Sequence, residues 1–186
     1  MTGLFALWLP ILLSAVIVFI ASALIHTVLP WHKGDYRSVA NEGQVSAALR
    51  PFAIPPGDYI LPRPASSGDL KSPEFLERVR QGPNIIMTVL PNAQWSMGRN
   101  LGLWFIYCLI VSILAAWLTG LAAPPGSDYH AVFHFIAITA FIGYAVALWQ
   151  MSIWWRRSWM TTFKATVDGI IYALLTAAAF AWLWPR

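Results

Sequence analysis

Cysteine and charged residues are scarce in this chain of 186 residues. The single cysteine, Cys108, cannot close a disulfide within the chain, which excludes a disulfide-stapled secreted scaffold. Charged residues make up 11% of the sequence and apolar residues 58%, whereas soluble domains are about a quarter charged. This balance excludes intrinsic disorder and is typical of a membrane protein.

Motifs for nucleotide binding and for common catalytic chemistry are also missing. The glycines form neither a GxxxxGK(S/T) loop nor a GxGxxG turn, and the serines form no GxSxG elbow. The net charge is +4, with no basic run interleaved with aromatic residues, so nucleic acid is not an expected partner. We therefore predict no catalytic residue and favour a protein that is not an enzyme.

Long apolar runs are what the chain has in abundance. Each of four runs covers about 20 residues or more, which as a helix crosses a hydrocarbon core of about 30 Å. They comprise residues 4–28, 101–123, 132–155 and 165–184. The alternating pattern of a transmembrane β-barrel is absent from the sequence. We therefore predict an all-α integral membrane protein with four transmembrane helices.

The remaining sequence is mainly an insert between the first two helices. We divide the chain into transmembrane helix 1 (residues 1–29), the insert of about 70 residues (residues 30–100), and helices 2–4 (residues 101–186). Nine of the thirteen prolines lie in the insert, so we expect an irregular segment that lies against a membrane surface or a partner.

Local signals predict short elements inside this insert. Residues 41–49 favour a helix, and a second helix is expected to begin with Ser72 as its N-cap and Pro73 at its first position. Residues 58–61 and 85–90 have the pattern of short strands that could pair with each other.

Basic residues and tryptophans predict the orientation. Eleven of the twelve Lys and Arg residues lie between helices 1 and 2 or between helices 3 and 4. The positive-inside rule makes that side cytoplasmic, so the insert would be inside and both termini outside a bacterial-type inner membrane. Tryptophan favours the lipid–water interface, and at the inner interface we expect Trp31, Trp95, Trp104, Trp154, Trp155 and Trp159.

The sharpest pair of candidate metal ligands is His130 and His134, at the start of the third helix. Their i, i+4 spacing places both rings on one helix face, with Cβ atoms about 5–6 Å apart. Two imidazoles can bind zinc or copper, and Asp128 could add a carboxylate. The alternative is a pair of polar groups at the lipid–water boundary, because the glutamate of an HExxH motif is absent. No cofactor is predicted for the chain, and zinc, copper, or a haem or chlorophyll shared with another chain are the alternatives left open at this pair.

A second candidate site is expected at the inner side of the membrane. His26 ends the first helix, and the following run as far as Arg37 is dense in charged and aromatic residues. Asp168 lies inside the fourth helix, where a carboxylate would cost up to about 2.5–3.5 kcal/mol at the membrane centre. It should therefore be paired or face water, as part of an ion or proton path or of a structural ion pair. The partners available at that depth are His26, Arg156, Arg157 and Lys164.

Three functions remain open on this sequence. The first is a non-enzymatic accessory, scaffold or assembly subunit of a larger membrane complex, in contact with the lipid bilayer and with other membrane proteins or copies of itself. The second is a small oligomeric transporter or channel that uses Asp168 and His26. The third is a metal- or pigment-holding membrane subunit that uses His130 and His134.

Overall fold

The computed structural model describes residues 1–93 and 96–186, and it divides into two compact units. We call Met1–Tyr36 together with Ser96–Arg186 the bundle unit, and Arg37–Trp95 the insert unit. Trp95, one of the tryptophans expected at the inner interface, lies outside the described residues.

The bundle unit contains four helices that are long and apolar enough to cross a membrane, as the sequence predicts. The first begins with a 3₁₀ turn at Leu4, and the third is built from two α-helices joined by a short 3₁₀ turn. The helices are α1 (Trp8–Thr27), α4 (Met97–Ala122), α5 (Tyr129–Tyr144) with α6 (Trp149–Ile153), and α7 (Trp159–Trp182).

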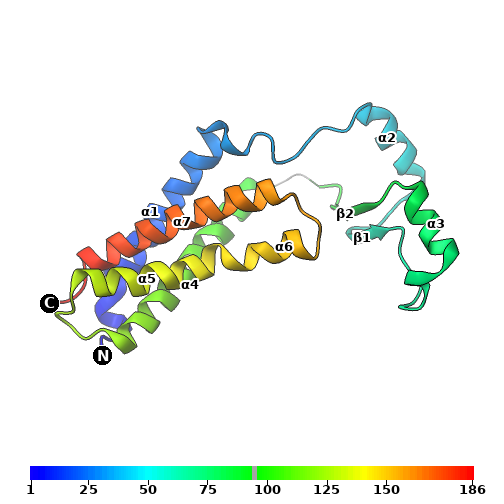
Figure 1. Ribbon diagram of the computed structural model, residues 1–186. Helices are drawn as coiled ribbons and strands as arrows, with labels where there is room; N and C mark the ends of the chain where they lie inside the picture. Colours follow the sequence, from blue (N-terminus) through cyan, green and yellow to red (C-terminus); the bar gives the residue numbers. More distant parts are fainter. Residues whose placement is uncertain (94–95) are drawn as a thin grey trace. The chain divides into compact units, whose positions relative to one another are not determined.

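These helices form a closed ring in which each packs against two neighbours. Helix α1 contacts α4 and α7, and α5 contacts the same two helices from the other side. Both chain termini lie at the same end of this bundle (Figure 1). The core between the helices is rich in small side chains, which let the backbones approach closely. Its fully buried alanines include Ala15, Ala115, Ala116, Ala140 and Ala177.

The third span differs from the single continuous helix expected for residues 132–155. Helix α5 ends at Tyr144, and the buried Ala145 departs from helical geometry with φ −127° before the chain resumes in α6. Gly169 of α7 packs directly against this break, because a Cβ at residue 169 would lie 2.6 Å from the Ala145 Cβ. This close contact sets the position of α7 next to Asp168.

The terminal end of the bundle is held together by hydrogen bonds to the backbone. The Thr2 N–H donates to the Gly120 carbonyl at 2.8 Å, and the Thr2 hydroxyl donates to the Ala123 carbonyl at 2.8 Å. The Trp184 indole donates to the Pro124 carbonyl at 3.1 Å. The loop between α4 and α5 is thus tied to both chain ends.

The insert unit has more regular structure than its prolines suggest. It contains α2 (Glu42–Leu49), β1 (Gly57–Leu61), α3 (Pro73–Gln81) and β2 (Ile85–Val89). The strands pair antiparallel from Gly57 opposite Val89 to Leu61 opposite Ile85, so the chain is not entirely α-helical. The Ser72 hydroxyl accepts a hydrogen bond from the Phe75 N–H at 3.1 Å, which is the N-cap that the sequence predicts.

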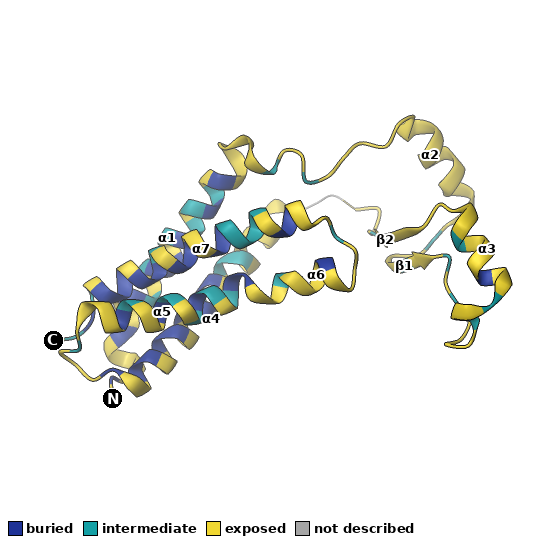
Figure 2. Cartoon of the chain, viewed as in Figure 1, coloured by how far each residue is buried: buried dark blue, intermediate teal, exposed yellow. Residues whose placement is uncertain are grey.

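Burial differs sharply between the two units. The helices of the bundle unit bury one face each, whereas the insert unit is exposed almost throughout (Figure 2). Among the described residues of the insert unit, Phe75 is the only apolar side chain that is buried. A core that could hold a site is therefore found in the bundle unit.

Candidate functional site

Three segments meet at the end of the bundle unit opposite the termini. Helix α1 ends at Thr27 with His26 in its last turn, and the chain then turns through a short 3₁₀ helix at Pro30–His32. Proline suits this turn because its fixed φ matches the first position of a helix. Helix α7 contributes Asp168, nine residues after its first residue, Trp159. His32 is thereby brought against α7.

Four polar side chains form a continuous chain of contacts here. His32 Nε2 lies 2.8 Å from Asp168 Oδ2, and His32 Nδ1 lies 2.6 Å from Asp35 Oδ2. The other Asp35 oxygen accepts a hydrogen bond from Lys164 Nζ at 2.8 Å. The side chains of Asp168, Asp35, His32 and Lys164 are 6%, 11%, 15% and 16% exposed, so all four are largely withdrawn from water.

A proton must lie in each of the two contacts between the histidine and the acids. Both His32 nitrogens face carboxylate oxygens, and an ionised carboxylate can only accept hydrogen bonds. Each contact therefore needs a proton between its two heavy atoms, carried by the imidazole or by the acid. Burial opposes ionisation of Asp35, but hydrogen bonds from Lys164 and His32 outweigh it and hold the pKa of this carboxyl below its usual range.

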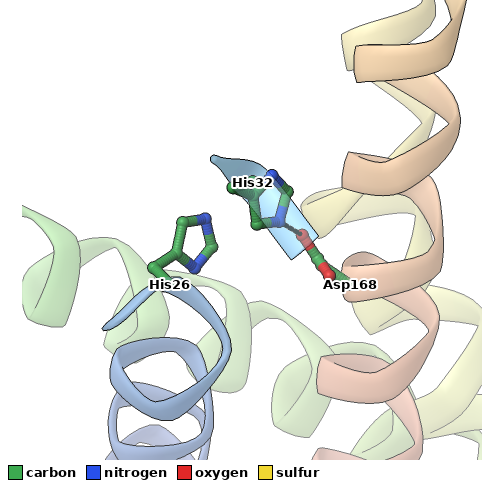
Figure 3. Close-up of side chains that lie close together, drawn as sticks. All are labelled: His26, His32 and Asp168. Atoms are coloured by element: carbon green, nitrogen blue, oxygen red, sulfur yellow. Dashed lines mark hydrogen bonds and ion pairs between the residues drawn. The ribbon is translucent and has the colours of Figure 1, made fainter. Parts of the chain in front are cut away.

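A second histidine extends the group. The His26 ring stacks on the His32 ring with centroids 4.4 Å apart and planes 5° from parallel. His26 Nδ1 lies 2.9 Å from the Ser22 carbonyl oxygen, which can only accept, so this nitrogen carries the proton and Nε2 is left available. Figure 3 shows the two rings side by side, with Asp168 meeting His32 from α7. We call His26, His32, Asp35, Lys164 and Asp168 the acid–histidine cluster.

The sequence predicts part of this cluster. His26, Lys164 and Asp168 come together as their depth suggests, but the direct partner of Asp168 is His32. Lys164 pairs with Asp35 instead. Arg156 is exposed, and within the described residues it forms no ion pair with Asp168. His32 and Asp35 lie in the charged run that follows the first helix, but their role depends on the turn at Pro30, which brings them back to α7.

The other histidine pair has different surroundings. His130 and His134 are exposed on the first turns of α5, and His134 Nδ1 lies 2.6 Å from the His130 carbonyl oxygen. Asp128 is the N-cap of α5, where one carboxylate oxygen accepts hydrogen bonds from the N–H groups of His130 and Ala131. Metal binding by this pair stays a prediction, and the structure gives Asp128 a local structural role.

Polar aromatic residues continue from the cluster into the bundle. Trp104, Tyr107, Tyr144 and Tyr172 form an aromatic nest with ring centroids 5.5–6.3 Å apart. The Tyr107 hydroxyl donates to the Gly143 carbonyl. The hydroxyls of Tyr144 and Tyr172 are buried without a hydrogen-bond partner in the part of the chain that the structure describes. Such groups are costly in apolar surroundings, so these two hydroxyls are unpaired polar groups inside the bundle.

The acid–histidine cluster can act as a cation site or as a proton-holding chain. Its donors are two imidazole nitrogens and a buried carboxylate, and one such atom from each of His26, His32 and Asp168 lies within 4.8 Å of the other two. Among the described residues, this is the one group of three potential metal ligands that come so close together.

Comparison of the chain with protein-family models, with curated proteins and with solved structures finds no match.

Proposed function

We propose that this chain is a small cation transporter or channel of the membrane, and that the acid–histidine cluster is its cation site. The observation that carries this proposal is the Asp168 carboxylate, buried inside a helix long and apolar enough to span a membrane and in contact with His32. Ionisable residues inside membrane helices are costly, and they commonly mark substrate, ion or proton pathways. A buried acid that serves packing alone is more cheaply replaced by an apolar residue.

A line of polar groups along α7 supports transport over static binding. Asp168, Tyr172 and Thr176 follow each other at i, i+4 spacing, so they lie on one face of α7, and all three are buried. Tyr144 of α5 lies beside Tyr172, with ring centroids 5.6 Å apart. These hydroxyls offer a proton or a partly dehydrated cation successive polar contacts beyond the cluster.

Flux through purified protein in liposomes tests the proposal. We expect wild-type protein to carry protons or metal cations across the membrane, detected by dyes trapped inside the vesicles. Asp168→Asn should abolish this flux, because asparagine keeps the size of the side chain and can still accept a hydrogen bond but carries no negative charge. Glu77→Gln is the matched control, since Glu77 is an exposed acid of the insert unit paired with Arg80. Folded Asp168→Asn protein with wild-type flux would refute the proposal.

One observation favours the accessory or assembly subunit as a second candidate function. The hairpin of the insert unit pairs Ile60 with Ile86 and Leu61 with Ile85, and all four side chains are exposed. Neighbouring positions of a strand point to opposite faces, so both faces of the hairpin present apolar groups. A lone two-stranded hairpin is at best marginally stable in water, and a partner surface would stabilise it.

Gentle detergent extraction followed by mass spectrometry tests this second candidate. We expect a defined set of membrane proteins to co-purify at a fixed ratio and to be lost with the double change Ile60→Asp, Ile86→Asp. Val39→Asp is the control, because Val39 is an exposed apolar residue of the same unit outside the strands. Partners that are retained by the double variant, or the absence of partners from the wild type, would contradict this role for the hairpin.

A further inference from the structure

We infer that the cation of the acid–histidine cluster is a divalent transition-metal ion of the zinc type, bound by His26 Nε2, His32 Nε2 and a carboxylate oxygen of Asp168. The inference rests on the proposed function, which requires a cation at this cluster, and it names the chemical class of that cation.

The donor atoms select the class of metal. Two imidazole nitrogens and one carboxylate oxygen suit zinc and the neighbouring divalent ions, whereas calcium and magnesium prefer sites made only of oxygen. The sole cysteine, Cys108, is buried elsewhere in the core, so thiolate does not bias the site toward copper(I).

The spacing of these atoms is close to that of a metal site. Zinc binds imidazole nitrogen at about 2.0–2.1 Å and carboxylate oxygen at about 2.0–2.2 Å, so two ligands of a tetrahedral ion lie about 3.3 Å apart. His32 Nε2 and Asp168 Oδ2 are 2.8 Å apart, and one ligand atom from each of His26, His32 and Asp168 lies within 4.8 Å of the other two. Binding of an ion would displace the proton from the His32–Asp168 contact and open it. It would also tilt the His26 ring out of its parallel stack, because a metal ion lies in the plane of each imidazole that binds it.

Both histidines are already held by their other ring nitrogen. A metal-binding histidine usually donates this second N–H to a carbonyl or carboxylate, which fixes its tautomer and orientation. His26 Nδ1 donates to the Ser22 carbonyl at 2.9 Å, and His32 Nδ1 lies 2.6 Å from Asp35. Asp35 is itself held by Lys164 at 2.8 Å. Both histidines therefore already have the hydrogen-bond partner that a metal-binding histidine usually has on its second ring nitrogen.

The three ligands differ in exposure in a way that suits entry of an ion. Asp168 is buried and His32 half-buried, whereas His26 is exposed. A cation would meet His26 first and then reach the two inner ligands. Three protein ligands also leave a fourth position open for water or an exchanging group, as in zinc sites that are not purely structural.

Metal binding to the purified full-length chain tests the inference. After removal of metal with a chelator, we expect one Zn²⁺ per chain by calorimetry and elemental analysis. Co²⁺ should give the intense visible absorption of a four-coordinate site. His26→Ala should weaken Zn²⁺ binding by more than about tenfold, and this exposed side chain can be removed without loss of the fold. Asp35→Asn should weaken binding by about 10–100-fold through the orientation of His32.

A double His130→Ala, His134→Ala variant is the matched control and should bind Zn²⁺ as the wild type does. Binding that is lost in this control and retained in His26→Ala would overturn the inference, as would the absence of stoichiometric metal from the wild type. Absence of metal binding together with Asp168-dependent proton flux would overturn the inference and leave the proposed function standing. Stoichiometric binding at His26 without flux of any cation would support the metal site and refute transport.

Discussion

The two histidine pairs of the bundle unit lie among very different neighbours. His130 and His134 share one helix face at the start of α5, and both remain exposed. His26 and His32 are six residues apart and separated by the end of α1, yet their rings stack and an acid from α7 meets one of them. The second pair gains its third partner because the chain turns back at Pro30.

The two pairs show that a binding site needs ligands from more than one helix. Helical spacing alone places two rings on one face, but in these two pairs any further ligand must come from another element. At the start of α5 the nearby acid, Asp128, is occupied in capping its own helix. At the other end, α1, the turn after it and α7 each contribute one residue, and their packing withdraws the acid from water.

Loss of His32 should have the largest effect on stability, and loss of His134 should have almost none. His32→Ala leaves the buried Asp168 without its partner, and removal of one member of a buried pair typically costs about 3–5 kcal/mol of stability. His134→Ala removes an exposed ring, and its effect should stay within about 0.5 kcal/mol. Reversible unfolding in mixed detergent micelles measures both changes.

A double variant separates the lost charge partner from lost packing. Adding Asp168→Asn to His32→Ala removes the unpaired charge, so the double variant should be more stable than His32→Ala alone. Equal stability of the single and double variants would mean that Asp168 is not held by His32 in the way the structure indicates.

Contact between α7 and the break in the third span should have the next largest effect. Gly169→Ala would place a Cβ 2.6 Å from the Ala145 Cβ, and such overpacking typically costs about 1–3 kcal/mol. It would also displace the neighbouring Asp168 and lower flux. Gly102→Ala in α4 is the matched control, because a Cβ there has nothing within 4 Å and alanine favours a helix. Equal behaviour of the two variants in unfolding and flux would show that the Gly169 contact does not position α7.

Much of the fold could be predicted because its signals are local. Four apolar runs are each long enough to span a membrane, and Ser72 followed by Pro73 predicts the start of α3 to the residue. That Asp168 needs a counter-group at its own depth could also be predicted, because a carboxylate in an apolar helix is costly when it is alone. His32, which meets this carboxylate, is not among the partners expected from the sequence.

The identity of the partner could not be predicted, because it depends on contacts between distant elements. His26 and His32 have no helical spacing, so their stacking follows from the turn at Pro30. The approach of α7 depends on Gly169 fitting against Ala145, where α5 ends early. Neither contact leaves a periodic pattern in the sequence, and from sequence position alone Lys164 and Arg156 are as well placed to meet Asp168 as His32 is.

Two of the three aspartates of the bundle unit, Asp128 and Asp168, differ in what their carboxylates do, and variants of them should show the smallest effects on stability. Asp128 acts through hydrogen bonds to backbone N–H groups, which an asparagine side chain can also accept. We expect Asp128→Asn to change stability little and Asp128→Ala to cost about 1 kcal/mol, both with unchanged flux. Asp168→Asn should show the reverse, with lost flux in a folded protein, because its charge and not its hydrogen-bonding shape is what the site requires. Unfolding and flux measured in parallel on these three variants would show which aspartate acts through its charge. A loss of flux in Asp128→Asn would mean that the start of α5 also carries a charge-dependent function.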